Sequence, residues 1–487
     1  MEYIYKINKF YLNINNKINF IKLKSKFIFT ISRTSGGVNL KFFFMFFILI
    51  LIKIFFIYIN ENNTFLNSSY IQIQNKCNIS FNNKIKSKIN LGIYAFGIKN
   101  GGRARSTSLI INYFKNISIF NVYLFTRRLK EDDEYTVPNN IKRVLIKNNL
   151  INKIKKYKID VLIYQLSLHN EIKKLNDYNK IKVIFYQHLG VFDWIYGNYT
   201  IFKTIYRDYL YSKYVVNIIP YENYYLFKKW GINSIYMNNF MTYNFSKILQ
   251  SQLSNKRILM IGRGDAKKKR FELGIIAMEY INQEIPQCEL IIISDLTGIL
   301  RHENLIINLN LSNNIIFAGY TVSPEIYYQN ASLNIVPSIS EAFPLVICET
   351  KIYGIPNLLM GLDYTSISEG GTVIIYDETP ESFAKAVIKQ LENQNYRNIL
   401  GNDARKSMKQ FNNNLLLMKW IKLILSIYNG DIFYNKMKEE DKYISENILF
   451  NVINQQIYLF KKRIPIFNNI TIKDFENFSY MEKYNIV

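Results

Sequence analysis

The chain is too long for a single hydrophobic core, because 487 residues with 49% hydrophobic content predict two or three domains. A formal net charge of +25 would suit a polyanionic partner. Lysine, however, is spread along the whole chain together with asparagine, isoleucine and tyrosine, which favours solvated surface lysines, so we expect no nucleic-acid partner. The three cysteines are widely separated and odd in number, which excludes a disulfide framework, and no two of the three histidines have metal-ligand spacing, so we expect no protein-built zinc site.

Residues 42–59 form the longest apolar segment, and Lys53 is its only charged residue. Its length is about the minimum for crossing the hydrocarbon of a bilayer. The basic segment 1–41 is long for a cleaved signal peptide, so we predict a transmembrane signal anchor; a buried core helix is the alternative. Five basic residues lie in the twenty positions before the span and one in the twenty after it, which places the N-terminus in the cytosol.

This orientation predicts a single-pass type II membrane protein of the Golgi or ER, with residues 60–89 as a stem. The alternative is an ER membrane protein whose later domains face the cytosol.

From residue 90 onward, short runs rich in Ile and Val alternate with longer amphipathic ones. Such runs are typical of strands buried on both faces, and helices between them make the sheet parallel. The rhythm restarts at residue 257 after a break near residues 239–255, so we predict an α/β protein with two doubly wound, Rossmann-like domains, 90–245 and 246–429, that face a cleft. We assign no role to the extension 430–487. The predicted strands are LGIYAF, NVYLFT, DVLIYQ, KVIFYQ and VVNIIP in the first domain, and RILMIG, ELIIIS, NIIFAG, LNIVPS, NLLM and VIIY in the second.

Ligands of such sheets bind beyond the carboxyl ends of the strands, so the loops there hold the candidate residues. Gly101 and Gly102 follow the first strand and open a helix; they suit a closely approaching anion, although a plain tight turn is the alternative. Arg105, about one helical turn further, either contributes charge there or is a solvated surface residue. His188 follows the fourth strand and can hydrogen-bond a hydroxyl or a developing charge; a structural histidine is the alternative.

The first loop of the second domain, GRGDAKKKR, is strongly basic. Arginine offers a planar fork and lysine a compact ammonium, and together they suit a diphosphate. Arg263 and Lys269 are the candidates, and a basic surface loop is the alternative.

The sequence ISEAFPLVICETKIYG follows the strand LNIVPS. Pro344 suits the first position of a helix, and backbone N–H groups at a helix start suit a phosphate or sugar oxygen. Glu341 precedes this helix and Glu349 lies near its second turn, so the two carboxylates need not form an acid/base couple. A carboxylate accepts two hydroxyl donors well, which is what a ribose diol presents.

Four segments of the chain, in their combined order along the sequence, resemble the retaining glycosyltransferases called group 1, or family four, which have the GT-B fold. The family's E-x7-E motif is similar to SEAFPLVICETKIYGIPNLL, its Gly-Arg…Lys segment to IGRGDAKKKRFELGIIAM, its Gly-Gly loop to GGRARSTSLIINYF, and its penultimate strand and helix to EGGTVIIYDETPESFAKAVIKQL. The likeness runs from about residue 91 to 428 and is strongest after residue 256.

The resemblance implies that Glu349 binds the donor ribose and that Glu341 faces the transferred sugar. It also implies that Arg263 and Lys269 hold the diphosphate, while His188 contacts the sugar or the acceptor. Further donor contacts are expected from the Gly-Gly loop and the helix start, at Gly101, Gly102, Phe343, Pro344 and Leu345.

Two departures from the family pattern are present. Arg270 follows Lys269 where family members commonly have Gly, which leaves Lys267 or Lys268 as alternatives to Lys269. Thr350 follows Glu349 where Ala is usual.

The residues and the resemblance together predict a retaining, metal-independent, hexosyltransferase-type enzyme. It would need no cofactor and would use a UDP- or GDP-linked sugar, with a glycan, lipid or protein as acceptor. The departing diphosphate would be stabilised by Arg263, Lys269 and the helix start at Pro344. The alternatives are a sugar-nucleotide epimerase of similar fold and a non-catalytic basic binding protein on a degenerate scaffold.

Overall fold

The computed structural model describes residues 87–430 with internal gaps, and these residues belong to one compact unit that spans Ile73–Val487. The predicted N-terminal segment 1–41, the anchor 42–59, nearly all of the stem and residues 431–487 lie outside the described residues. Within the described ranges, no helix is both long and apolar enough to cross a bilayer. The gaps are 100, 133, 148, 166–167, 169, 179, 189, 191–207, 210, 221, 224–231, 244, 246–247, 265–266 and 363–366.

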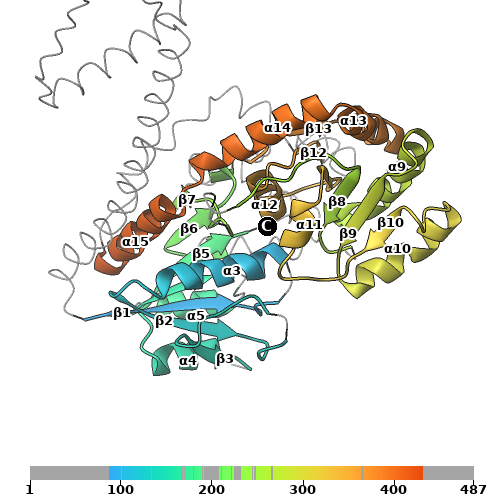
Figure 1. Cartoon of the computed structure of the whole chain (residues 1–487). Helices are drawn as coiled ribbons and strands as arrows, with labels where there is room; N and C mark the ends of the chain where they lie inside the picture. Colours follow the sequence, from blue (N-terminus) through green and yellow to red (C-terminus); the bar gives the residue numbers. More distant parts are fainter. Residues whose placement is uncertain are drawn as a thin grey trace, which may run out of the picture. The chain divides into compact units, whose positions relative to one another are not determined.

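Two parallel sheets carry the described part of the chain (Figure 1). The first has the strand order β3-β2-β1-β4-β5-β6-β7 and the second the order β10-β9-β8-β11-β12-β13. The strands of the first sheet are β1 (Ile89–Ala95), β2 (Phe120–Thr126), β3 (Lys142–Leu145), β4 (Val161–Tyr164), β5 (Lys182–Gln187), β6 (Tyr214–Asn217) and β7 (Ser234–Tyr236); those of the second are β8 (Arg257–Ile261), β9 (Glu289–Ile293), β10 (Ile315–Phe317), β11 (Leu333–Val336), β12 (Asn357–Met360) and β13 (Thr372–Ile375).

The α/β class, the parallel sheets and every predicted strand are confirmed. The structure adds β3 and β7, which the sequence analysis missed because they are short and lie at the two edges of the first sheet. An edge strand is covered on fewer sides than a central one and so carries a weaker apolar signal. The central strands β4 and β6 are buried along their whole length, as their continuous apolar runs predict.

Helices connect the strands and cover the sheets (Figure 1). In the first part of the chain these are α3 (Gly101–Phe114), α4 (Leu150–Lys156) and α5 (Asn170–Asp177). In the second part they are the 3-10 turn η2 (Lys267–Lys269), α9 (Phe271–Glu284), α10 (Leu296–Asn308), α11 (Glu325–Gln329), α12 (Leu345–Ile352), α13 (Pro380–Glu392), α14 (Gln394–Ser407), the 3-10 turn η3 (Met408–Gln410) and α15 (Asn413–Asn429).

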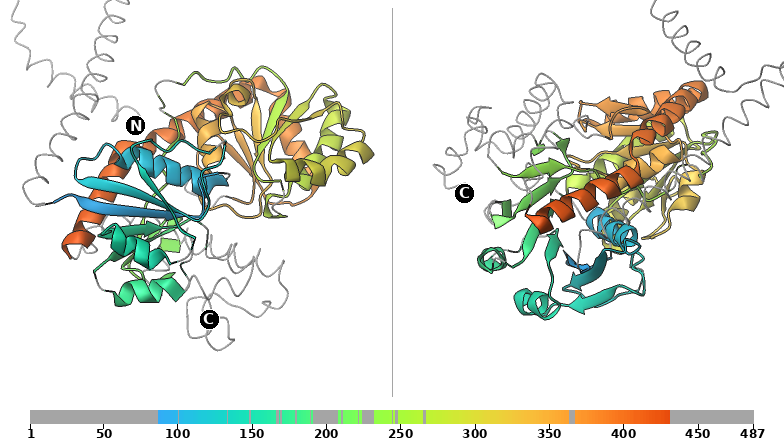
Figure 2. Two further views of the ribbon diagram at one scale, coloured as in Figure 1. Left: turned by 90° about the horizontal axis from the view of Figure 1, so that it is seen from below. Right: turned by 90° about the vertical axis from the view of Figure 1, so that its left-hand side faces the viewer.

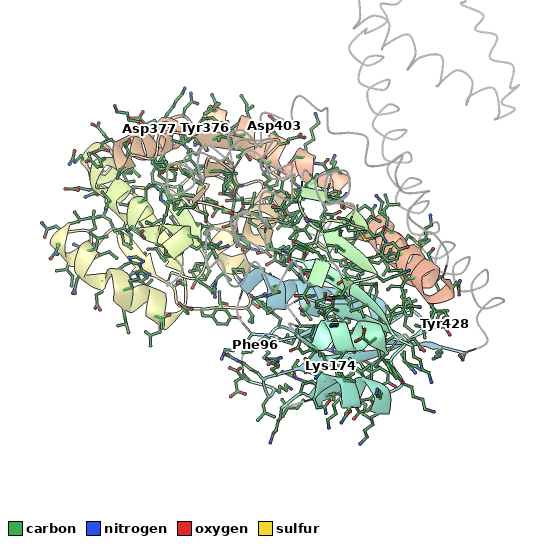
Figure 3. The ribbon with its side chains drawn as sticks, turned by 180° about the vertical axis from the view of Figure 1, so that it is seen from behind. Phe96, Lys174, Tyr376, Asp377, Asp403 and Tyr428 are labelled. Atoms are coloured by element: carbon green, nitrogen blue, oxygen red, sulfur yellow. The ribbon has the colours of Figure 1, made fainter. Side chains whose placement is uncertain are left out.

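The last described helix, α15, packs against the first domain, although chain order alone assigned residues 246–429 to the second (Figures 1 and 2). Its Trp420 is fully buried, with its ring centroid 6.2 Å from that of Phe114 on α3 and 5.1 Å from that of Tyr186 on β5. Tyr428, near the end of α15, lies on the first-domain side, whereas Tyr376 lies at the upper edge of the second domain (Figure 3). The physical reason is that the apolar face of α15 completes the core of the first domain, so the chain returns there.

Each sheet reverses its strand order once, and ligands of doubly wound folds bind beyond the carboxyl ends of the strands at such a reversal. In the first sheet the reversal lies between β1 and β4, with Tyr94 paired to Tyr164. In the second it lies between β8 and β11, with Asn334 paired to Leu259. The Gly-Gly loop, the basic loop and the E-x7-E segment follow β1, β8 and β11, so the fold brings all three predicted loops to the reversal points.

Candidate active site

The basic loop after β8 and the acidic segment after β11 meet at the reversal point of the second sheet. The backbone N–H of Ile339 donates to the carbonyl of Lys268 at 2.8 Å, which ties the two loops together. The Lys269 ammonium forms an ion pair and a hydrogen bond with Glu341 Oε1. The structure thus joins two residues that the sequence separates by 72 positions.

Glu341 is held as a carboxylate although it is buried. Burial favours its neutral form, but the ammonium groups of Lys269 and Lys268 and the hydrogen bonds from Lys269 and Ser338 outweigh burial and lower its pKa. Since the folded-state pKa is depressed, this group contributes stability above its unfolded pKa and loses it as the pH falls through the folded value. At neutral pH Glu341 therefore presents a negative charge and is a poor proton donor.

The structure explains the departure at Arg270. Arg270 is the residue before α9 and has a φ of 50°, in the left-handed region that glycine adopts without cost. The position at which the family commonly has Gly is therefore a true left-handed position here, which supports the alignment of Lys269 with the family's lysine. Arg270 also forms an ion pair with Glu378 at 3.3 Å.

Arg270→Gly should therefore be less destabilising than Arg270→Ala. Both variants lose the ion pair with Glu378, but only glycine relieves the left-handed backbone, which costs an L-residue about 1 kcal/mol. We expect Arg270→Gly to change the free energy of unfolding by less than about 1 kcal/mol, as measured by denaturant titration of both variants. A more stable Arg270→Ala would contradict this backbone assignment.

The start of α12 offers backbone groups rather than side chains. Pro344 precedes the helix, in an extended conformation, and has no N–H of its own. Ile347 and Cys348 donate their N–H groups to the Pro344 carbonyl, so the amides of Leu345 and Val346 begin the helix. The side chains of Phe343 and Leu345 are each 5% exposed and belong to the core, so a donor contact here involves their backbone.

Glu349 is 1% exposed, and its carboxylate already accepts from three protein side chains. Arg105 Nη1 lies 3.1 Å from Oε1 and 3.2 Å from Oε2, the Thr242 hydroxyl donates to Oε1 at 2.8 Å, and the Tyr328 hydroxyl donates to Oε2 at 2.7 Å. A carboxylate has room for about four donors. A ribose diol would therefore have to replace at least one of these protein donors to bind Glu349.

Arg105 is the partner that sequence reasoning left open, and the structure shows that it is not a solvated surface residue. It reaches from α3 of the first domain to Glu349 on α12 of the second, and its guanidinium lies 5.6 Å from the ring centroid of Tyr135. Burial acts to lower the pKa of Arg105, but the carboxylate of Glu349 outweighs it and raises that pKa. No sequence signal could have found this pair, because its members are 244 positions apart.

Thr350 turns away from this network. Its hydroxyl is fully buried and hydrogen-bonds the Val346 carbonyl at 2.9 Å and Asn357 Oδ1 on β12 at 3.0 Å. The second departure from the family pattern therefore leaves the surroundings of Glu349 unchanged.

His188 follows β5 and is 9% exposed, with its ring centroid 4.1 Å from that of Tyr186. Its Nε2 is buried and has no hydrogen-bond partner among the described residues. Burial, together with the charge of Arg103, lowers the pKa of His188 to about 3, so the imidazole is neutral at physiological pH. A neutral imidazole can donate or accept a hydrogen bond with a ligand, but it is a poor general acid.

We therefore expect kcat/KM to show no titration near the ordinary histidine pKa of about 6.5, since this profile reports the free enzyme. The depressed pKa puts the titration of His188 near pH 3, below the working range. His188→Ala should lower activity without removing an inflection between about pH 5 and pH 8. An inflection in that range that disappears in His188→Ala would show that the imidazole titrates as an acid or base.

The two glycines after β1 differ in what they require. Gly101 has a φ of 84°, so an L-residue there would be strained, whereas Gly102 has no such constraint. A side-chain atom at either position would meet nothing within 4 Å. Both positions thus leave space at the start of α3, beyond the carboxyl end of β1.

Arg103, in the first turn of α3, is a charged residue that sequence reasoning did not single out. Burial and the charge of Arg263 lower the pKa of Arg103 to about 10, so a charge of the second domain acts on this residue of the first. Its position after the Gly-Gly pair is the one sequence signal that could have identified it.

Comparison with known proteins gives this geometry a family context. Residues 243–407 match the family described as Glycosyl transferases group 1. No curated protein matches. Among solved structures, the chain is similar to sucrose-phosphate synthase from Thermosynechococcus elongatus (17% identity, TM-score 0.60, 71% of this chain and 100% of that chain). It is also similar to a mutant of TarM from S. aureus in complex with fondaparinux, alpha-GlcNAc-glycerol and UDP (13%, 0.58, 70% and 100%), and to Anabaena HepE with UDP-glucose (13%, 0.56, 69% and 99%).

These identities are low, so the structural likeness shows the fold alone: the GT-B arrangement of two doubly wound domains. The family match covers the domain that holds Arg263, Lys269, Glu341 and Glu349. Together they support a group 1 glycosyltransferase.

Proposed function

We propose that this protein is a retaining, metal-independent glycosyltransferase that moves a hexosyl-type sugar from a UDP- or GDP-linked donor to a glycan, lipid or protein. The observation that carries the proposal is the Lys269–Glu341 pair at the reversal point of the second sheet, within the segment that matches group 1. UDP and UDP-glucose in the structures of TarM and HepE support a nucleotide-sugar donor.

In the proposed retaining transfer, the bond between sugar C1 and the diphosphate oxygen breaks, and the acceptor hydroxyl oxygen bonds to C1 from the same face. Glu341 is negative and paired with Lys269, and His188 is a weak base with a pKa of about 3. The acceptor proton therefore passes to the departing phosphate oxygen, which is the stronger base. Arg263, Lys269 and the amides at the start of α12 stabilise the charge that develops on that oxygen.

The remaining roles are proposals of the same kind. Glu349 binds the ribose of the nucleotide sugar after one of the protein groups that hydrogen-bond its carboxylate moves away. Glu341 orients the transferred sugar. His188 bonds the sugar or the acceptor, and the protein needs no resident cofactor. Residues 42–59 anchor the chain as a single-pass type II protein of the Golgi or ER, or hold it on the ER membrane with the enzyme facing the cytosol.

A donor panel tests the activity. Purified full-length protein is incubated with UDP- and GDP-linked sugars, and release of the nucleoside diphosphate and the anomeric configuration of the product are measured. Slow hydrolysis of one donor with retained configuration is expected. Conversion of a nucleotide sugar into its epimer without release of the diphosphate would favour an epimerase, and the absence of turnover and of binding for the whole panel would overturn the proposal.

A further inference from the structure

Two arginines from different domains stand at the domain boundary without a carboxylate partner among the described residues. Arg103 lies in the first turn of α3 and is partly buried, and Arg263 lies in the loop after β8 and is exposed. The neighbouring cations differ in this respect, since Arg105 pairs with Glu349 and Lys269 with Glu341.

The contacts around α3 fix the position of Arg103. Two residues further along the helix, Arg105 contacts α12 of the second domain. Ser106 donates to Asn239 Oδ1 at 2.8 Å, and the Thr107 hydroxyl bonds Gln165 Oε1 at 2.6 Å, beyond the end of β4. The first turn of α3 is therefore held above the carboxyl edge of the first sheet and against the second domain.

The contacts around the basic loop fix the other side. The hydrogen bond from Ile339 to Lys268 and the pair between Lys269 and Glu341 hold this loop against the segment before α12, the helix that Arg105 contacts. Arg103 and Arg263 thus approach the same boundary from opposite domains, and the charge of Arg263 helps to lower the pKa of Arg103. An anion bound between two arginines would offset the repulsion between them and would accept strong, charge-assisted hydrogen bonds from both.

Two buried polar atoms on the first-domain side also lack hydrogen-bond partners among the described residues. These atoms are His188 Nε2 and Gln165 Nε2. Buried polar atoms normally have partners, and their lack points to a ligand or an ordered water at this edge. The Thr107 hydroxyl lies 2.9 Å from the Arg103 carbonyl and 2.6 Å from Gln165 Oε1, so Gln165 lies beside the first turn of α3.

We propose that Arg103 binds the diphosphate of the donor from the first domain, opposite Arg263 of the second. The inference rests on the proposed function and adds a residue to it. Lys269 is shared with Glu341, so two further cations, Arg103 and Arg263, would help to balance the two negative charges of a diphosphate diester. The donor is then held by one cation from each domain, and its binding stabilises the contact between them.

Calorimetric titration of the full-length protein with UDP, GDP, uridine and guanosine tests this. Wild-type protein should bind one diphosphate much more tightly than its nucleoside. Arg103→Ala should weaken that diphosphate by about 10-fold or more, since a hydrogen bond to a charged group contributes about 1.5 to 3 kcal/mol, and should leave the affinity for the nucleoside unchanged. Arg128→Ala is the matched control, because Arg128 is 58% exposed and the same charge is removed.

The outcomes separate the inference from the function on which it rests. If the wild type does not prefer either diphosphate to its nucleoside, the donor assignment itself fails. If the wild type shows the preference and Arg103→Ala and Arg103→Gln keep it, only the role of Arg103 is overturned. Arg103→Gln serves as the second variant if Arg103→Ala does not fold.

Discussion

Replacing Arg105 with alanine should destabilise the protein by about 3 to 5 kcal/mol, the usual cost of leaving a buried charge without its partner. Glu349 is 1% exposed and the Arg105 side chain 12% exposed, so water cannot replace the lost guanidinium. Thr242 and Tyr328 would still donate to Glu349, but neither supplies a compensating charge. The free energy of unfolding of the full-length protein from denaturant titration measures the effect.

Two further variants show whether the cause is the unpaired charge. Arg105→Ala combined with Glu349→Gln should be less destabilised than Arg105→Ala alone, because the double variant buries no charge. Arg128→Ala should cost about 0 to 1 kcal/mol, since the Arg128–Glu131 pair is exposed and its atoms are 3.8 Å apart. Equal losses in the single and double variants would mean that Arg105 stabilises the protein through packing instead of charge.

Lys269→Ala should lower kcat by about 100- to 1,000-fold, with a smaller change in KM, because the ammonium meets charge that grows as the diphosphate departs. The variant also leaves the buried Glu341 carboxylate without its main partner, so part of the loss comes from misplacement of Glu341. The measurement is steady-state kinetics on the best donor of the panel, together with the unfolding free energy as a check on the fold.

The controls for this prediction are chosen from the same domain. Lys389→Ala removes an exposed lysine on α13 and should leave kcat unchanged. Arg263→Ala should also lower kcat by about 100-fold or more, and the double variant should lose less than the product of the single losses, because both residues would act on one leaving group. Full activity in Lys269→Ala, combined with a loss in Lys268→Ala, would move the role to the neighbouring lysine.

The two acidic residues of the E-x7-E segment are held by different parts of the molecule. Glu349 and Glu341 share one helix and its preceding loop, yet they have different partners: Arg105 from the first domain and Lys269 from the second. The proposed roles follow this division, with Glu349 linked to binding of the donor and Glu341 to the reacting sugar.

The sequence alone determined the local architecture of this protein. Short runs such as VLIY and YVVN lie in strands, because parallel strands that are covered by helices on both faces are buried along their whole length and therefore read as nearly continuous apolar segments. The placement of Lys269 and Glu341 in loops after strands, and of Glu349 on the helix that follows, was also readable, since strands, turns and a helix-starting proline are local signals. Edge strands β3 and β7 were not, because with four and three residues, KRVL and SIY, they are too short to show a clear apolar pattern.

Only the tertiary structure decided which of these residues meet. The contact of Arg105 with Glu349 and the return of α15 to the first domain join positions hundreds of residues apart, and no spacing in the sequence encodes them. The neutral state of His188 and the charged state of Glu341 likewise depend on burial and on neighbours from other loops. The physical reason is that desolvation and Coulomb interactions depend on distance in space, and that distance is fixed only when both sheets and their connecting helices have packed.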